Sequence, residues 1–216
     1  MSVSMMVSQL VGGMFVSIQI FVVTLIFSLP LGMIVAFGRM SNNPLLKGIV
    51  KVYISVMRGT PLMLQLMVVY FGPYYLFGIK ITNSYRLWAA LIGFVINYAA
   101  YFAEIFRGGF QSVDQGQFEA ARVLRLSYWQ TLRKIIIPQV IKIVIPSIGN
   151  EVINLVKDSS LVYVIGLGDL LRAGNVATSR DVTLVPLMLV GLIYLILVGI
   201  CTLILRQVEK CYAYFK

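Results

Sequence analysis

The chain has 216 residues, of which 59% are hydrophobic and only 12% are charged, about half of the roughly 25% charged residues found in soluble domains. This composition excludes an ordinary water-soluble globule, and the high hydrophobicity excludes a disordered chain. The net charge of +10 at pH 7 would suggest nucleic-acid binding in a soluble protein. In a membrane protein it indicates the Lys and Arg excess that fixes topology, so we expect a lipid bilayer and no nucleic acid as partner.

Five apolar runs predict five transmembrane helices, because a helix satisfies its own backbone hydrogen bonds within lipid. No Asp, Glu, Lys or Arg occurs from Met1 to Gly38, and the fifth run also carries no charge. The second run is interrupted by Arg58-Gly59-Thr60-Pro61. We therefore expect an all-α, multi-pass membrane protein with a single transmembrane domain over residues 1–216. The predicted spans cover about 14–37, 49–76, 87–106, 135–156 and 182–205.

The distribution of basic residues predicts which side of the membrane each loop faces. Twelve Lys and Arg residues belong to the first loop, the third loop and the C-terminal tail with their flanking residues, against four in the second and fourth loops. The richer group is expected in the cytoplasm. The N-terminus is then outside and the C-terminus in the cytoplasm, which agrees with an odd number of spans.

Polar residues at helical spacing follow one face of three of the runs. A charge at the bilayer centre costs about 2.5–3.5 kcal/mol, so we expect these faces to line protein or a water-filled path. The fifth run has no such stripe and is expected to face lipid. The stripes are Lys51, Ser55, Arg58 and Gln65 on the second run, Gly93, Asn97, Tyr101, Glu104 and Gly108 on the third, and Ser147, Asn150, Glu151, Asn154, Lys157 and Asp158 on the fourth.

These stripes supply the candidate residues for binding a solute. Lys157 and Asp158 carry both signs of charge, which suits a zwitterionic ligand, and Arg58 lies at a predicted helix break of the kind that forms transporter sites near the midplane. Two alternatives stay open: polar side chains that only join helices, and an ion pair of Glu104 with Arg107 three residues later. The candidate substrate-binding residues are Arg58, Asn97, Tyr101, Glu104, Asn154, Lys157, Asp158 and Ser159.

The third loop contains a predicted docking helix over about residues 117–127. Asp114 and Gly116 are plausible start signals, and Phe118, Ala121 and Leu124 are expected to form an apolar edge with basic residues on the other side. A basic amphipathic helix lying on anionic headgroups is the alternative. A docking helix for a cytoplasmic partner fits better, because the segment lies between two spans.

Within this helix, Glu119-Ala120-Ala121, followed by Ile135, Ile137 and Pro138, resembles the EAA loop of permease subunits of ATP-binding-cassette (ABC) importers. The glycine of that pattern falls on Arg125 and its leucine on Ile137. Because glycine permits a sharp turn between two short helices, the sequence leaves the geometry at Arg125 open. Further segments resemble the polar amino acid uptake branch of the family: Arg58-Gly59-Thr60-Pro61-Leu62, the stretch from Asn97 to Gly109, Lys157-Asp158-Ser159-Ser160-Leu161, and Ile165-Gly166 with Asp169.

The resemblance implies a type I ABC importer permease core in the cell inner membrane. Its implied partners are ABC ATPase subunits, a second permease (a homodimer copy or a paralogue), an extracytoplasmic solute-binding protein and an amino acid substrate. The chain has no G-x-x-x-x-G-K-[ST] motif, so we expect no enzymatic site here: ATP and Mg are bound by the ATPase partner, and no cofactor or metal by this chain. The residues expected to couple to the ATPase are Phe118, Glu119, Ala120, Ala121, Arg122, Leu124 and Arg125.

Function is then expected to be alternating-access import of polar, preferably basic, L-amino acids. The apolar segment from Leu161 to Ile165 is expected to form part of an outer gate, with Leu161 and Tyr163 as its gate residues. Two other classes stay open. An ATP-independent secondary transporter or channel explains the intramembrane charges but not the docking helix, and a membrane anchor for a cytoplasmic enzyme does not explain the polar faces.

Overall fold

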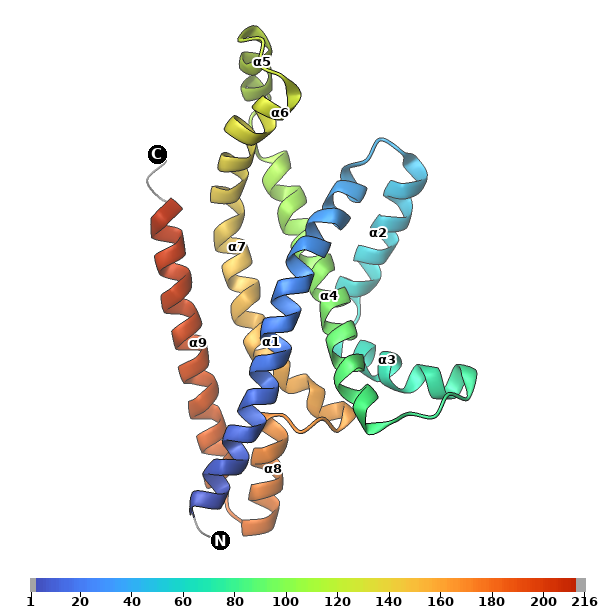
Figure 1. Cartoon of the computed structure of the whole chain (residues 1–216), viewed down its shortest axis with the longest axis vertical. Helices are drawn as coiled ribbons and strands as arrows, with labels where there is room; N and C mark the ends of the chain where they lie inside the picture. Colours follow the sequence, from blue (N-terminus) through green and yellow to red (C-terminus); the bar gives the residue numbers. More distant parts are fainter. Residues whose placement is uncertain (1–2, 213–216) are drawn as a thin grey trace.

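The computed structural model describes residues 3–212, and all regular structure in this range is helical (Figure 1). Nine α-helices, one π-helical turn (η1) and one 3-10 helix (η2) follow one another without a strand in the described range. Their order is α1 Val3–Met40, α2 Pro44–Gly59, α3 Leu62–Phe77, α4 Asn83–Gln111, α5 Gln115–Val123, α6 Tyr128–Thr131, η1 Leu132–Ile136, α7 Ile137–Asp158, η2 Ser159–Ile165, α8 Leu170–Asp181 and α9 Val185–Tyr212.

Helices α1 and α4 pack against each other at the centre of the bundle (Figure 1). A side chain at Gly32 would place its Cβ 2.7 Å from Cβ of Phe102, so glycine is what allows the two helices to approach here. In the same way, Gly109 lets α4 approach Val144 of α7. Small residues are the usual means of close packing between membrane helices, where the hydrophobic effect gives no advantage to association.

Within residues 3–212, four helical segments are long and apolar enough to cross a membrane, or five if the bent pair of α2 and α3 counts as one span. The predicted spans 14–37 and 87–106 lie inside longer helices, because a helix can continue beyond the part that hydropathy marks: α1 covers 3–40 and α4 covers 83–111. The fourth prediction, 135–156, lies inside a helical segment from Tyr128 to Ile165. The fifth prediction, 182–205, overlaps α9, which begins at Val185 and ends at Tyr212.

The second predicted run, 49–76, is not a straight span. Its two halves α2 and α3 meet at an angle of 108°, because Thr60 and Pro61 are extended and proline cannot continue the backbone hydrogen-bond ladder. The predicted interruption is confirmed, but α3 runs sideways at the end of the bundle instead of continuing α2 (Figure 1).

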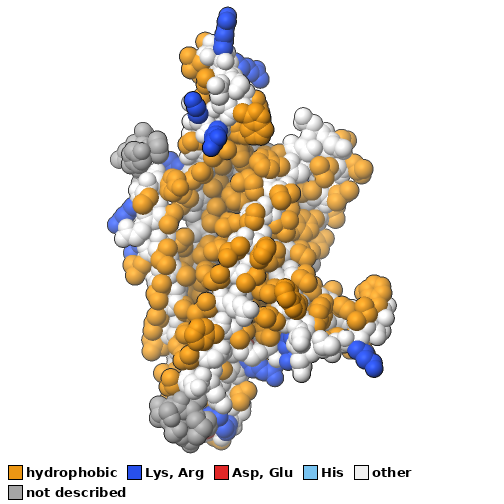
Figure 2. Space-filling model, in the orientation of Figure 1, with side chains coloured by type: hydrophobic (Ala, Val, Ile, Leu, Met, Phe, Trp, Pro, Cys, Tyr) orange, Lys and Arg blue, Asp and Glu red, His pale blue; other side chains and the backbone are white. Residues whose placement is uncertain are grey.

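The two ends of the bundle carry different structures. Helix α5 projects beyond the other helices at one end, where α9 also ends, whereas α8 and the beginning of α1 lie at the opposite end (Figure 1). On the face drawn in Figure 2, apolar side chains cover the middle of the bundle and Lys and Arg gather toward the ends. Helix α9 has only 6% of its most apolar window buried, in agreement with its expected lipid-facing position.

Candidate functional site

A polar pocket of about 460 Å³ opens between α2 and α4. Arg58 of α2 lies over the ring of Tyr101, with its Cζ 5.2 Å from the ring centroid, and its Nη1 is 3.9 Å from Oε2 of Glu104. The structure therefore brings together three of the predicted substrate-binding residues. The pocket is lined by Arg39, Lys51, Ile54, Ser55, Arg58, Gly59, Tyr101 and Glu104.

The single acid of this pocket is already paired. Arg107 donates from Nη2 to Oε2 of Glu104 at 2.6 Å and from Nε to both carboxylate oxygens at 3.0 and 3.1 Å. The ion pair at i, i+3 that the sequence left as an alternative is thus formed. Because Arg107 and Arg58 share one carboxylate, the pocket has a surplus of positive charge and suits an anionic group such as a carboxylate.

A second polar cluster joins α4 to α7. Tyr98, which is 2% exposed, donates from its hydroxyl to Oδ2 of Asp158 at 2.7 Å. Glu151, one to two turns earlier on α7, interacts with Asn154 and lies within electrostatic reach of both Asp158 and Arg58. The ring of Tyr98 is 6.1 Å from that of Tyr101, so the two clusters are neighbours along α4. This cluster has a surplus of negative charge.

Three predicted substrate-binding residues lie outside both clusters. Asn97 is 3% exposed and its amide donates to the carbonyl of Met57 and to Oε1 of Gln65, both at 2.9 Å. This satisfies a backbone carbonyl freed by the break between α2 and α3. Ser159 is 2% exposed and donates to the carbonyl of Val156 at 2.8 Å. Lys157 is exposed on α7.

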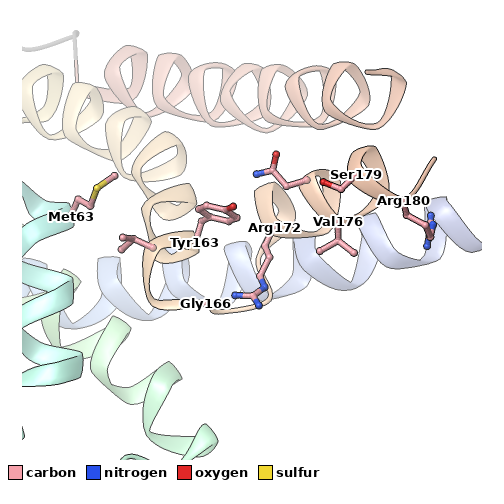
Figure 3. Close-up of a pocket in the computed structure, with 9 residues that line it drawn as sticks. Met63, Tyr163, Gly166, Arg172, Val176, Ser179 and Arg180 are labelled. Carbon is pink, nitrogen blue, oxygen red and sulfur yellow. The ribbon is translucent and has the colours of Figure 1, made fainter. Parts of the chain in front are cut away.

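A further pocket, of about 880 Å³, lies at the α8 end of the bundle (Figure 3). It contains one of the two predicted gate residues, Tyr163 of η2, which is 46% exposed, whereas Leu161 packs against the hydrophobic core. Opposite η2, helix α8 contributes Arg172 and Arg180. These two arginines were not predicted as site residues, because the residues around them in the sequence do not distinguish them from other loop cations. The pocket is lined by Met63, Tyr163, Val164, Gly166, Arg172, Asn175, Val176, Ser179 and Arg180.

Helix α8 begins at a buried acid, Asp169. Its carboxylate accepts hydrogen bonds from the backbone N–H groups of Leu171 and Arg172 at 3.0 and 3.1 Å, although the residue is fully buried. Burial raises the pKa of Asp169 above its ordinary value, and the backbone hydrogen bonds oppose that shift. The folded protein therefore favours the protonated acid more than the unfolded chain does.

We expect thermal stability to reflect this buried acid. A raised pKa in the folded state contributes stability at low pH that is lost as pH rises above about 4 and through the folded pKa. Asp169→Asn keeps a good N-cap and should remove this loss, which is measured as the melting temperature of both proteins between pH 4 and 8. Asp181→Asn is the control, because an ion pair with Arg180 lowers the pKa of Asp181. A wild-type curve parallel to that of Asp169→Asn would contradict the expectation.

The predicted docking helix overlaps α5, and the predicted start signal Asp114 is confirmed as the residue that caps it. Asp114 precedes it, and its carboxylate accepts a hydrogen bond from the backbone N–H of Gly116 at 2.6 Å. Both ends of this helix were predicted too late: the helix covers 115–123 rather than 117–127. It ends there because Arg125 has a left-handed conformation with φ of 53°.

Two backbone hydrogen bonds close the end of α5. The N–H of Arg125 donates to the carbonyl of Arg122, and the N–H of Leu126 donates to that of Ala121, both at 3.0 Å. This is the Schellman pattern, in which glycine is the preferred left-handed residue. The turn is therefore present at the position where the EAA pattern has glycine. Arg125 adopts there the left-handed conformation that glycine adopts more easily.

Replacing Arg125 by glycine is expected to stabilise this turn. A left-handed conformation costs an L-residue about 1–2 kcal/mol, and glycine avoids that cost. Arg122→Gly is the matched control, because Arg122 is helical and glycine costs about 1 kcal/mol there. We expect hydrogen exchange of the 115–126 amides to slow in the first variant and to accelerate in the second. Faster exchange in Arg125→Gly would show that the arginine side chain itself holds the turn.

The side chains of α5 divide into a packed and an exposed set. Ala121 is 1% exposed, and Phe118 lines an apolar pocket of about 300 Å³ with Phe37 and Phe110. Leu124 was expected on the packed edge, but it is 69% exposed because the helix has already ended there. Glu119, Ala120, Arg122 and Arg125 are exposed, at the end of the molecule where Figure 2 shows several basic side chains.

Comparison with known proteins adds four findings. Residues 28–209 match the family model of the binding-protein-dependent transport system inner membrane component. The chain is 41% identical over 199 residues to the arginine transport system permease protein ArtQ of Bacillus subtilis, covering 92% of this chain and 90% of that one. It is 36% identical to the L-cystine transport system permease protein TcyL of the same organism, with 90% and 83% covered. A crystal structure of an amino acid ABC transporter with histidines matches with a TM-score of 0.86 and 33% identity over 94% of both chains.

Proposed function

The chain belongs to the family of binding-protein-dependent transport system inner membrane components, and from this premise we propose that it is the membrane subunit of an importer for basic L-amino acids. The family match, together with the similarity to ArtQ and to the amino acid ABC transporter structure, indicates an amino acid ABC permease. Its proposed partners are ABC ATPase subunits that bind ATP and Mg, an extracytoplasmic solute-binding protein, and a second permease that is either a copy or a paralogue. The α5 end faces the cytoplasm in this proposal, and the N-terminus lies outside.

The observation that carries the proposal is the pair of oppositely charged clusters on the adjoining faces of α2, α4 and α7. Arg58, beside Tyr101, binds the α-carboxylate of the substrate. Asp158, with Glu151 and Asn154 nearby, binds the positive groups. A basic amino acid has one carboxylate and two cationic groups, which suits a cationic pocket at Arg58 next to the two acids Asp158 and Glu151. The similarity to ArtQ, a permease protein of an arginine transport system, supports this choice, whereas the cystine of the TcyL system represents the competing substrate class.

The same helices give a route for mechanical coupling. Helix α5 follows α4 after only Ser112, Val113 and Asp114, and it leads through α6 and η1 into α7 and η2. A displacement of α5 by the ATPase is therefore transmitted to α4 and α7, the two helices that the Tyr98–Asp158 hydrogen bond joins. Separating α4 from α7 opens the path of the substrate. The 3-10 helix η2, with Tyr163, then moves at the outer end of the helical segment that contains α7. This is alternating access by relative motion of helix groups.

An ATP-independent secondary transporter was the alternative expected from the intramembrane charges alone. The relatives and the structure named above are permease proteins of transport systems or an ABC transporter, and they give the alternative no support. The exposed docking surface of α5 has no purpose in a transporter without an ATPase.

Stimulation of ATP hydrolysis tests the proposal. We expect the complex of this chain, its ATPase and its binding protein to hydrolyse ATP faster with arginine or lysine than with glutamine or cystine. Equal or stronger stimulation by the neutral amino acids would reject the basic substrate class but keep the importer. Hydrolysis that responds to no amino acid would reject the importer.

A further inference from the structure

A second, smaller pocket lies where α1 ends, α2 begins and α4 ends. It has a volume of about 350 Å³, and its lining contains three cations and no acid: Arg39, Met40, Lys47, Arg107 and Gln111. The polar pocket next to it shares Arg39 and adds Lys51 and Arg58. Five cations from three helices thus surround this corner. Arg39, Lys51 and Arg58 also line the polar pocket next to it, whereas Lys47 and Arg107 line the smaller pocket.

The positive charge of the corner is not balanced by the side chains around it. Glu104 is the acid that the described residues place there, and Arg107 and Arg58 already share it. Arg107 also donates to Oε1 of Gln111. The charge of Arg39 interacts with Glu104 electrostatically at longer range. The side chain of Lys47 is exposed. Like charges that converge on one pocket repel one another unless an anion lies between them.

The local backbone holds these cations in place. Asn43 caps α2, its side-chain oxygen accepting from the N–H groups of Leu45 and Leu46 at 3.0 and 3.3 Å. The N–H of Ser41 donates to the carbonyl of Gly38. The backbone positions of Arg39 and Lys47 are therefore held on either side of a tight connection between α1 and α2, which brings both side chains to the same pocket.

We propose that this corner is a binding site for a phosphate-type oxyanion, with Arg39, Lys47 and Arg107 as the groups that contact it. Guanidinium groups bind phosphate oxygens through paired hydrogen bonds, and lysine adds a point charge. The oxyanion is the phosphodiester of an anionic phospholipid or free inorganic phosphate. Basic pockets between membrane helices are known to bind lipid headgroups. Leu45, two residues before Lys47 on α2, has a side chain that is 72% exposed and is suited to contact acyl chains.

Lipid retention tests the proposal with the full-length chain in its complex. The complex is placed in nanodiscs of phosphatidylglycerol and phosphatidylcholine, and the lipids that stay bound are counted by native mass spectrometry. Removing a cation is expected to weaken anionic lipid binding by about fivefold, so Arg39→Gln with Lys47→Gln should reduce preferential retention of phosphatidylglycerol by roughly 25-fold. The matched control, Arg133→Gln with Lys134→Gln, removes two exposed cations outside the pocket and should retain the lipid.

A second arm distinguishes the two sources of the oxyanion. Inorganic phosphate is titrated against the complex in phosphatidylcholine alone, with sulfate and chloride for comparison. Saturable phosphate binding that the Gln variants lose, without preference for phosphatidylglycerol, assigns the site to free phosphate. Equal lipid retention in both double variants, together with no phosphate binding, overturns the proposal. If the Arg39 variant does not fold, the single Lys47→Gln variant still tests it through the expected fivefold effect.

Discussion

Replacing Asp158 by asparagine is expected to reduce the uptake of arginine by about 10- to 100-fold. A hydrogen bond to a charged group contributes about 1.5–3 kcal/mol, and the Asp158 carboxylate is the acid of the α4–α7 cluster that Tyr98 holds in place. Glu104→Gln should have a smaller effect, because Arg107 already neutralises Glu104. Uptake of labelled arginine by the reconstituted complex measures both variants.

A control variant tests whether the loss of arginine uptake is specific to the acids of the two clusters. Glu209→Gln removes one exposed acid from α9, far along the chain from both clusters, and should leave uptake unchanged. If arginine uptake is unchanged in Asp158→Asn and Glu104→Gln alike, neither acid binds the substrate. The preference for a basic amino acid is then wrong, although an importer for neutral amino acids would survive.

Replacing Ala120 by arginine is expected to separate this chain from its ATPase partner. Ala120 is exposed on α5, so a larger side chain has no effect on packing within the chain, and exposed substitutions usually change stability by no more than about 0.5 kcal/mol. In a docking surface the same change blocks contact. We expect affinity for the ATPase to fall by about 30-fold, as for a residue at the centre of an interface, measured by co-purification and by transport.

Gln207→Arg provides the matched control for this prediction. It adds the same charge to an exposed position of α9 at the same end of the bundle as α5, and the ATPase should still bind. If the ATPase binds Ala120→Arg as tightly as the wild type, α5 is not the docking helix. The alternative from the sequence, a basic amphipathic helix on anionic headgroups, would then be the better interpretation.

Local sequence signals predicted the features of the fold that depend on local chemistry. Glycine and proline on either side of Thr60 predicted the break between α2 and α3, because neither residue favours a continuous helix. Helical spacing placed Tyr101 and Glu104 on one face of α4, and the structure confirms that this face meets Arg58. Asp114 predicted the start of α5 by its capping oxygen.

Features that depend on contacts between distant residues could not be predicted in this way. Tyr98 is an aromatic residue in an apolar run, and only the approach of α7 shows that it donates to Asp158, 60 residues later. The stripe containing Asn97 was predicted correctly as a polar face, but which partner each side chain finds is set by tertiary packing. The left-handed Arg125 had no signal of its own, since arginine is an ordinary helical residue.

The coupled movement of amino acid through this chain is tested most directly by uptake into vesicles. The complex of this chain, its ATPase and its binding protein is reconstituted with ATP on the α5 side, and labelled arginine is supplied on the α8 side. Accumulation that needs ATP and stops in Ala120→Arg is the result expected. Accumulation that proceeds equally without ATP, or in vesicles lacking the ATPase, would contradict the central claim that this permease works through α5.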